Sequence, residues 1–325
     1  MSQESFLFQE EAIGFLPGET VLDSLLRNNK TIPHGCKVGS CQSCLLQSNG
    51  IAPPAKSQVG LSSLLKENNC FLACRCDATA VDEVQTVGDD IIPRFETSFI
   101  EKSMLSKDVM RLRIKVLGDF SFEPGMFVRL STPERLTRSY SIANSSLSNC
   151  KFLEFHIRLI DGGMMSTYLA TTDVPELQLQ GPLGTCYYQS DQPERSVVFI
   201  GSGTGLAPLY AILTNALQKG HTGPLSLYIG GATAGSLYFI EELEDLSSRY
   251  ENVEVVFCSD TEDQSQRTET GSPLTVAANS HPSFAGYQVY TCGHPELVKA
   301  VKRKVFMAGA SMSDIFADSF DNQSS

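Results

Sequence analysis

Short segments of alternating apolar and polar residues occupy the first half of the chain. A period of two is typical of strands that bury one face. It predicts strands at residues 5–9, 12–16 and 45–47, together with longer alternating segments at 96–117, 126–130, 152–159 and 176–180. The longer segments predict an antiparallel barrel or sandwich. One early segment, 20–28, has apolar residues at helical spacing and predicts a helix.

From residue 195 onward, strands and helices alternate in the predicted order. Fully apolar runs predict buried strands at residues 196–200, 225–229, 253–257 and 287–291. Helical spacing of apolar residues predicts helices at 206–218, 241–250 and 296–308. This alternation implies a parallel sheet that is covered by helices on both faces.

The change of pattern divides the chain into three predicted domains. At 325 residues the chain has room for two or three domains of about 100–200 residues each. Segment 89–94 contains a proline and is typical of a linker. We therefore expect a cysteine-loop domain at 1–92, a β domain at 93–192 and an α/β domain at 193–325.

Composition and charge exclude several classes of protein. The chain is 42% hydrophobic and 19% charged, as in ordinary globular proteins, and its net charge is −12. The acidic excess lies in residues 1–92 and 191–325, which argues against nucleic-acid binding. The most apolar stretch, 197–217, is interrupted by glycines and polar residues, so we expect no membrane helix. Without a signal peptide at the start, a cytoplasmic location is expected.

Ten cysteines need an explanation in that compartment, where structural disulfides are rare. Six of them lie between Cys36 and Cys76, which indicates a metal site. Cys36, Cys41 and Cys44 have the spacing C-x4-C-x2-C, and Cys74 follows. This spacing is typical of plant-type ferredoxins, in which four thiolates hold a 2Fe–2S cluster.

Two alternatives accompany the cluster prediction. A structural zinc site is one, but zinc ligands usually come as two C-x2–4-C pairs. The choice of fourth ligand is the other, because Cys70 and Cys76 are neighbours of Cys74. We select Cys74 and interpret Cys70 and Cys76 as ordinary thiols. Cys150, Cys186 and Cys258 have no partner at useful spacing and are expected in the core.

Two segments of the middle domain have the chemistry of a flavin site. The first is an R-x-Y-S motif of Arg138, Ser139, Tyr140 and Ser141, in which the arginine can neutralise a pyrophosphate. Its tyrosine face can pack on an isoalloxazine ring. The second places glycines before a helix predicted to start near Ser166, and backbone N–H groups at a helix N-terminus bind phosphate. Surface residues and a plain helix cap are the alternatives.

A glycine turn and a Cys–Gly turn in the last domain have the placement of a nucleotide site. Gly203, Thr204, Gly205 and Pro208 follow an apolar strand and open a helix, as a pyrophosphate-binding turn requires. The turn departs from the usual G-x-G-x-x-G pattern. The second turn, which follows strand 287–291, consists of Cys292, Gly293, His294 and Pro295. Its alternative is a buried strand end.

These motifs resemble a known family over nearly the whole chain. Residues 1–92 resemble a plant-type ferredoxin domain, and the rest resembles the ferredoxin–NADP reductase superfamily. The fused order is similar to that of the reductase components of multicomponent bacterial oxygenases, and to a related reductase of dideoxysugar synthesis. The resemblance implies a β-grasp ferredoxin domain, an antiparallel β-barrel FAD domain and a parallel-sheet α/β nucleotide-binding domain.

The resemblance also implies roles for particular residues. In this family the R-x-Y-S motif and the segment that contains Gly163, Met164, Met165 and Ser166 bind FAD. His156, Ile157 and Arg158 match the strand beside the dinucleotide and are assigned to FAD. The glycine turn looks like the family's G-x-G-x-A-P variant, and Cys292, Gly293 and Pro295 look like the C-G-x-P turn beside the nicotinamide. Phe320 matches an aromatic residue near the flavin, unless it is a frayed terminal residue.

The expected reaction is electron transfer from NADH through FAD and the cluster to an acceptor protein, with an oxygenase component as the expected partner. NADH is favoured over NADPH because segment 230–235 has no basic residue and Asp260 is acidic, although Arg267 can reach a 2′-phosphate. No side chain is required as a general acid or base. The alternatives are electron donation to a nucleotide-sugar dehydrase and a non-catalytic redox sensor. The sequence does not predict an oligomeric state.

Overall fold

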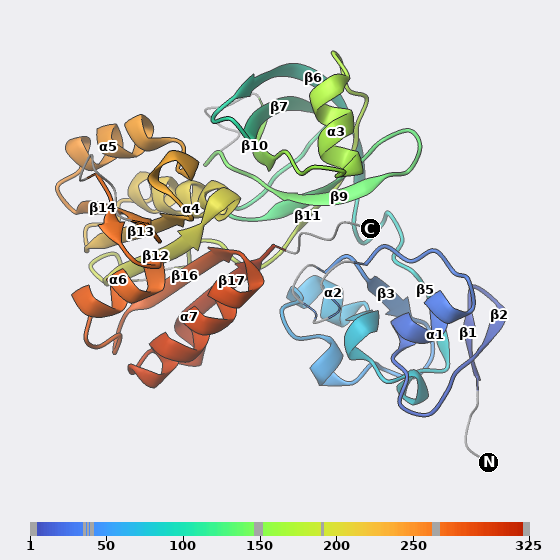
Figure 1. The fold of residues 1–325 in the computed structure, drawn as a ribbon. Helices are drawn as coiled ribbons and strands as arrows, with labels where there is room; N and C mark the ends of the chain where they lie inside the picture. Colours follow the sequence, from blue (N-terminus) through green and yellow to red (C-terminus); the bar gives the residue numbers. More distant parts are fainter. Residues whose placement is uncertain are drawn as a thin grey trace. The chain divides into compact units, whose positions relative to one another are not determined.

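The chain folds into two compact units in the computed structural model (Figure 1). The structure describes residues 5–34, 37, 39, 42–145, 152–189, 192–261 and 267–320. The first unit holds the described residues up to Arg94 together with Gln180–Thr185. The second holds the described residues of 95–179 and 186–320.

The first unit is built on a five-stranded mixed sheet in the order β2-β1-β5-β3-β4. Its strands are β1 (Ser5–Phe8), β2 (Glu11–Gly14), β3 (Leu45–Ser48), β4 (Cys70–Leu72) and β5 (Glu83–Thr86). The helices are α1 (Val21–Arg27) and α2 (Ser63–Glu67), with 3-10 turns η1 (Ala55–Ser57), η2 (Ala73–Arg75) and η3 (Ala78–Ala80). Thr20 caps α1 by accepting a hydrogen bond from the Asp23 N–H. This is the predicted β-grasp arrangement.

A six-stranded antiparallel sheet in the order β10-β7-β6-β11-β8-β9 forms the first part of the second unit. Its elements are β6 (Arg94–Met104), β7 (Val109–Leu117), β8 (Phe127–Ser131), β9 (Thr137–Ser141), β10 (Leu153–Arg158), α3 (Met164–Thr171) and β11 (Gln178–Leu183). Just beyond β9, the Ala143 N–H donates to the Glu154 carbonyl of β10 over 2.8 Å. This bond nearly closes the sheet, so the barrel prediction is confirmed and the sandwich alternative is wrong.

The last part of the chain forms an all-parallel sheet in the order β15-β14-β13-β12-β16-β17. Its strands are β12 (Val197–Ser202), β13 (Leu225–Gly231), β14 (Val253–Ser259), β15 (Glu269–Thr270), β16 (Gln288–Gly293) and β17 (Ile315–Ser319). The helices are α4 (Leu206–Gln218), α5 (Ile240–Arg249), α6 (Pro273–Ser280) and α7 (Pro295–Met307), with turns η4 (Gly203–Gly205), η5 (Ala234–Ser236) and η6 (Met312–Asp314).

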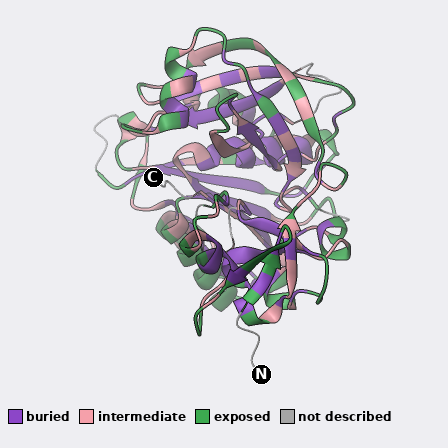
Figure 2. Ribbon diagram, turned by 90° about the vertical axis from the view of Figure 1, so that its right-hand side faces the viewer, coloured by how far each residue is buried: buried purple, intermediate pink, exposed green. Residues whose placement is uncertain are grey.

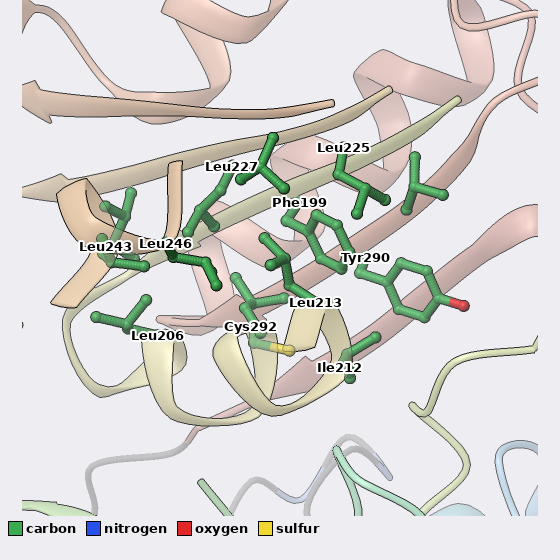
Figure 3. Packing of buried hydrophobic residues seen from close by; sticks show 14 of the residues in the cluster. Phe199, Leu206, Ile212, Leu213, Leu225, Leu227, Leu243, Leu246, Tyr290 and Cys292 are labelled. Atoms are coloured by element: carbon green, nitrogen blue, oxygen red, sulfur yellow. The ribbon is translucent and has the colours of Figure 1, made fainter. Parts of the chain in front are cut away.

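The parallel sheet buries both of its faces, as the continuous apolar strands predict. In β12, Val197 and Phe199 join the cluster under α4 and α5, whereas Val198 and Ile200 join the cluster under α6 and α7. Figure 3 shows the first of these clusters. Buried positions follow the central strands of the sheet (Figure 2). Within the described residues, no helix combines the length and the apolar character that a membrane crossing requires.

Candidate functional site

The order of the parallel sheet defines where a nucleotide would bind. From β12 the chain runs to β13 on one side, and β16 lies on the other side. In open α/β sheets, ligands bind beyond the carboxyl ends of the strands at such a switch point. Gly203–Gly205 follow β12, and Cys292 and Gly293 end β16. The fold therefore brings the two predicted nucleotide turns together.

The glycine turn leaves room for close backbone contact. A Cβ atom at Gly205 would lie 2.3 Å from the Cys292 carbonyl oxygen, so only glycine fits between the ends of β12 and β16. Helix α4 begins directly after the turn, and its first N–H groups have no partner within the helix. Pro208 lies in this first turn, where a missing N–H costs nothing. The arrangement can receive a phosphate group.

Cys292 lies below this edge with its side chain in the core. The residue is fully buried against the α4 side of the sheet, where Ile212 and Leu213 also pack (Figure 3). Burial, with a hydrogen bond to Cys186, raises the pKa of the Cys292 thiol well above its ordinary value. Its thiol is therefore protonated at neutral pH, and the backbone of the following turn faces the nucleotide edge.

The rest of the Cys–Gly turn fixes the start of α7 and the end of the chain. Gly293 has a φ of +123°, which favours glycine. Pro295 is the first residue of α7, and His294 caps the helix by accepting a hydrogen bond from the Glu296 N–H. The Phe320 N–H donates to the Gly293 carbonyl over 2.8 Å, so Phe320 is held beside this turn rather than frayed.

Asp318, in the adjacent strand β17, was not among the predicted site residues. Its carboxylate Oδ2 accepts a hydrogen bond from the Ser141 hydroxyl over 3.2 Å. Ser141 is the last residue of the R-x-Y-S motif, on β9 of the barrel. Phe320, two positions further on, was selected from its resemblance to the family, whereas Asp318 was not.

The remaining residues of the R-x-Y-S motif lie along β9. Ser139 pairs with Arg129 in the β8–β9 ladder, and Arg138 pairs with Leu130. The Tyr140 ring packs edge-on against Phe155, with ring centroids 6.4 Å apart, and burial raises its pKa well above the ordinary value. Tyr140 is therefore an un-ionised, fixed aromatic surface.

Helix α3 presents its N-terminus at Gly163, close to the predicted start near Ser166. The Ser166 hydroxyl donates to the Gly163 carbonyl over 3.1 Å and so braces this end of the helix. Met165 is buried in the barrel core, whereas Met164 is exposed. At the other end, the Lys102 ammonium donates to the carbonyls of Leu169, Ala170 and Thr172.

The three predicted residues of β10 point in different directions. Ile157 is buried in the barrel core. The Arg158 guanidinium is paired with Asp108, and its Nη2 lies 3.1 Å from where a Cβ of Gly203 would stand. The buried His156 ring bonds to the hydroxyl of Tyr238 and to Glu154. Arg158 thus lies beside the nucleotide turn, and both nitrogens of His156 contact protein groups.

Of the predicted cluster ligands, Cys44 and Cys74 are described, whereas Cys36 and Cys41 fall outside the described residues. Strands β3 and β4 pair Leu45 with Leu72, and the Ala73 N–H donates to the Cys44 carbonyl over 3.0 Å. Cys74 directly follows Ala73. The two cysteines therefore lie at the same end of one ladder, where two thiolates can reach a common metal centre.

The neighbouring cysteines have a different character. Cys70 pairs with Gln47, three ladder positions away from Cys44, and burial raises its pKa to about 11. Burial also raises the pKa of Cys76 to about 11. Cys70 thus lies away from the ladder end that Cys44 and Cys74 share. Cys186 and Cys258 are buried, as expected, and Cys150 lies outside the described residues.

Three families of domains match this chain in sequence. They are described as a 2Fe-2S iron-sulfur cluster binding domain over residues 9–79, an oxidoreductase FAD-binding domain over 96–188 and an oxidoreductase NAD-binding domain over 199–303. Together with the glycine turn, the helix N-terminus and the paired cysteines, these matches define the class. The chain is an NAD(P)H-dependent flavoprotein oxidoreductase with a 2Fe–2S domain.

Its homologues are reductase components of multicomponent oxygenases. The reductase component of the naphthalene 1,2-dioxygenase system of Pseudomonas putida is 29% identical over 316 residues, which cover 95% of both chains. The xylene/toluene monooxygenase electron transfer component of Pseudomonas putida is 28% identical, over 94% of this chain and 90% of the relative. The crystal structure of the Amycolatopsis cytochrome P450 reductase GcoB matches with a TM-score of 0.70 at 25% identity, over 98% and 99% of the chains.

Proposed function

We propose that this protein is the reductase component of an oxygenase system, which oxidises NADH and delivers electrons through its 2Fe–2S domain to an oxygenase component. The proposal rests on one observation above all: three cofactor domains follow each other in one chain, and the reductase component of the naphthalene 1,2-dioxygenase system aligns with 95% of that chain. We propose a cytoplasmic location as well, because six of the ten cysteines lie between Cys36 and Cys76, as expected for a metal site rather than for structural disulfides.

In this proposal the barrel holds FAD through two groups of residues. Arg138 and the N-terminal N–H groups of α3 would face the pyrophosphate, and Met164 to Ser166 supply that helix end. Tyr140 would pack on the ring system, and Ser139 and Ser141 would face its polar edge. Bound flavin supplies the conversion of one two-electron donation into two single-electron deliveries.

The nicotinamide nucleotide would bind across the carboxyl ends of β12 and β16. The Gly203–Gly205 turn and Pro208 form its pyrophosphate seat, and the Arg158 guanidinium beside Gly203 adds positive charge from the barrel side. Gly293 and the backbone of Cys292 would border the nicotinamide, with Phe320 and Pro295 behind them. Arg267 is paired with Glu244 over 3.1 Å, which supports a preference for NADH.

Cys36, Cys41, Cys44 and Cys74 would hold the cluster as thiolates. Residues 1–92 carry 11 acidic and 6 basic side chains. A partner with a basic docking face would therefore be steered toward this unit.

Anaerobic stopped-flow spectroscopy with NADH tests the proposal. Flavin bleaching should precede reduction of the cluster, and Cys41→Ser should abolish only the second phase. A colourless protein that holds neither iron nor flavin after reconstitution would contradict it. A protein with both cofactors but negligible NADH-dependent ferricyanide reduction would instead be a redox sensor.

A further inference from the structure

A buried chain of polar side chains joins the barrel to the loop that follows β13. His156 on β10 contacts the Tyr238 hydroxyl through Nδ1 over 3.0 Å and Glu154 through Nε2 over 3.1 Å. Glu154 in turn accepts a hydrogen bond from Arg113 over 2.6 Å. The carboxylate beside Nε2 can only accept, so this nitrogen carries a proton, and in the neutral ring Nδ1 accepts from the Tyr238 hydroxyl.

These hydrogen-bonded side chains are shielded from water. His156 and Tyr238 are buried, and Glu154 is nearly so. Although burial opposes ionisation, hydrogen bonds from His156 and Arg113 lower the pKa of Glu154, so the carboxylate is charged and fixes the imidazole ring. An unpaired buried polar group is costly, so the ring has one favourable orientation, with Nδ1 toward Tyr238.

Tyr238 belongs to the segment that borders the proposed nucleotide seat. Ser202, directly before the glycine turn, pairs with Gly230 at the end of β13. The chain then runs through the Thr233–Ser236 capping box and reaches Tyr238 a few residues later. In such sheets, the loop after the second strand lies beside the ribose of the ADP half. The position of Tyr238 therefore determines where this loop stands.

The next residue shows that the loop is held in place rather than relaxed. Phe239 has a φ of +63°, which is an unfavourable conformation for an aromatic residue. Its ring contacts the His156 ring, with centroids 5.1 Å apart, and the Tyr210 ring of α4, with centroids 5.0 Å apart. Such strain persists only where the surroundings impose it.

We propose that His156 of the barrel is a positioning residue for the nicotinamide nucleotide, which acts through Tyr238 to hold the Thr233–Ser236 loop against the ADP half. The inference rests on the proposed function, because it deepens the nucleotide site defined there. It also gives His156 a role separate from FAD contact, since both ring nitrogens are engaged by protein groups.

The test compares two buried tyrosine–histidine pairs of the second unit. Tyr238→Phe removes only the hydroxyl that faces His156. Tyr188→Phe is the matched control. The Tyr188 hydroxyl bonds to His221 Nδ1 over 2.8 Å, and His221 lies in the loop between α4 and β13, at the sheet edge opposite to the proposed nucleotide site. Calorimetric titration with NAD⁺ and with ADP-ribose measures binding without turnover.

Tyr238→Phe should weaken the binding of both ligands about fivefold, as expected for one buried hydrogen bond of about 1 kcal/mol. KM for NADH should rise by the same factor, with kcat for ferricyanide and the ratio of FAD to protein unchanged. Tyr188→Phe should lower the melting temperature similarly but leave both dissociation constants unchanged.

Substitutions of His156 separate its two contacts. His156→Asn places an amide where Nδ1 stands and should retain ADP-ribose binding, whereas His156→Gln reaches the Nε2 position and should not. Equal effects of Tyr238→Phe and Tyr188→Phe, or loss of FAD instead of nucleotide affinity, would overturn the inference alone. A wild-type protein that binds neither ligand would overturn the proposed function as well.

Discussion

The Ser141 hydroxyl donates a hydrogen bond to the Asp318 carboxylate over 3.2 Å, across 177 positions of sequence. Ser141 ends the R-x-Y-S strand of the barrel, and Asp318 lies on the last strand of the parallel sheet. The contact joins the proposed flavin motif to the C-terminal strand β17, which ends directly before Phe320. It therefore fixes two sides of the proposed redox centre relative to each other.

Replacing Ser141 with alanine should slow flavin reduction by NADH about tenfold or more, because small losses of alignment at a reacting centre are costly. Stopped-flow absorbance at the flavin band measures this rate. Ser131→Ala is the control, since its hydroxyl bonds to Thr137 on the same hairpin, 2.7 Å away, without contacting the C-terminal strand. Equal rates for Ser141→Ala and wild type would show that the contact only stabilises the fold.

Replacing Cys74 with serine should remove the 2Fe–2S absorption, whereas Cys70→Ser should retain it. The reason is geometric: Cys74 shares its ladder end with Cys44, whereas Cys70 pairs with Gln47, further along the ladder. Iron content and visible absorption of the purified variants measure the outcome. A cluster lost in Cys70→Ser but kept in Cys74→Ser would reverse the assignment.

Lys102→Met should weaken FAD binding as well as the fold. The ammonium donates hydrogen bonds to three carbonyls at the end of α3. Removing this donor leaves the carbonyls without a partner and should destabilise the helix end by about 1–2 kcal/mol. We expect a severalfold rise in the FAD dissociation constant, measured by flavin fluorescence during dilution. Lys115→Met, at an exposed position of β7, is the control and should change neither quantity.

Asp260→Arg should shift nucleotide preference toward NADPH. Asp260 follows β14 at the carboxyl edge of the sheet, is exposed, and an arginine there can pair with a 2′-phosphate. The ratio of kcat/KM for NADPH to that for NADH should rise about tenfold, which corresponds to roughly 1.4 kcal/mol. The exposed Glu251→Arg adds the same charge away from this edge. A similar shift there would point to overall charge instead of a specific contact.

Acid should destabilise the first unit through Glu19. Hydrogen bonds from Arg27, the Leu16 N–H and Ser24 lower the pKa of Glu19 from 4.5 to about 2, although burial opposes this. Because the folded-state pKa is depressed, the contribution is fully present above pH 4.5 and is lost as pH falls toward about 2. Urea unfolding of wild type should show this slope, and Glu19→Gln should be less stable at neutral pH and lack it.

The pattern of the chain predicted the elements well wherever burial is periodic. Helix α4 spans the predicted residues 206–218, because its apolar face repeats at helical spacing. Strand β5 was missed because Val84 is its only buried residue. Helix α6 was missed because only Pro273 and Ala277 are buried, although Ser272 and Pro273 form a helix start.

The sequence pattern could not predict contacts between distant segments of the chain. Glycine turns and strand ends have local signatures, and the structure has Ser141 and Arg158 at the ends of β9 and β10 and Gly203 in the turn after β12. The partners of those residues depend on how the barrel and the parallel sheet meet. Neither the Asp318 contact of Ser141 nor the Tyr238 contact of His156 has a local signal, because each joins elements separated by more than 80 residues.

The pairing of β3 with β4 gives the iron centre a further property. Cys44 directly precedes β3 and Cys74 follows β4, at the same end of a short hydrogen-bonded ladder, so fraying of that ladder would draw two of the proposed donors apart and release the metal. Loss of colour would then report on local opening of a few backbone bonds long before the polypeptide as a whole melts.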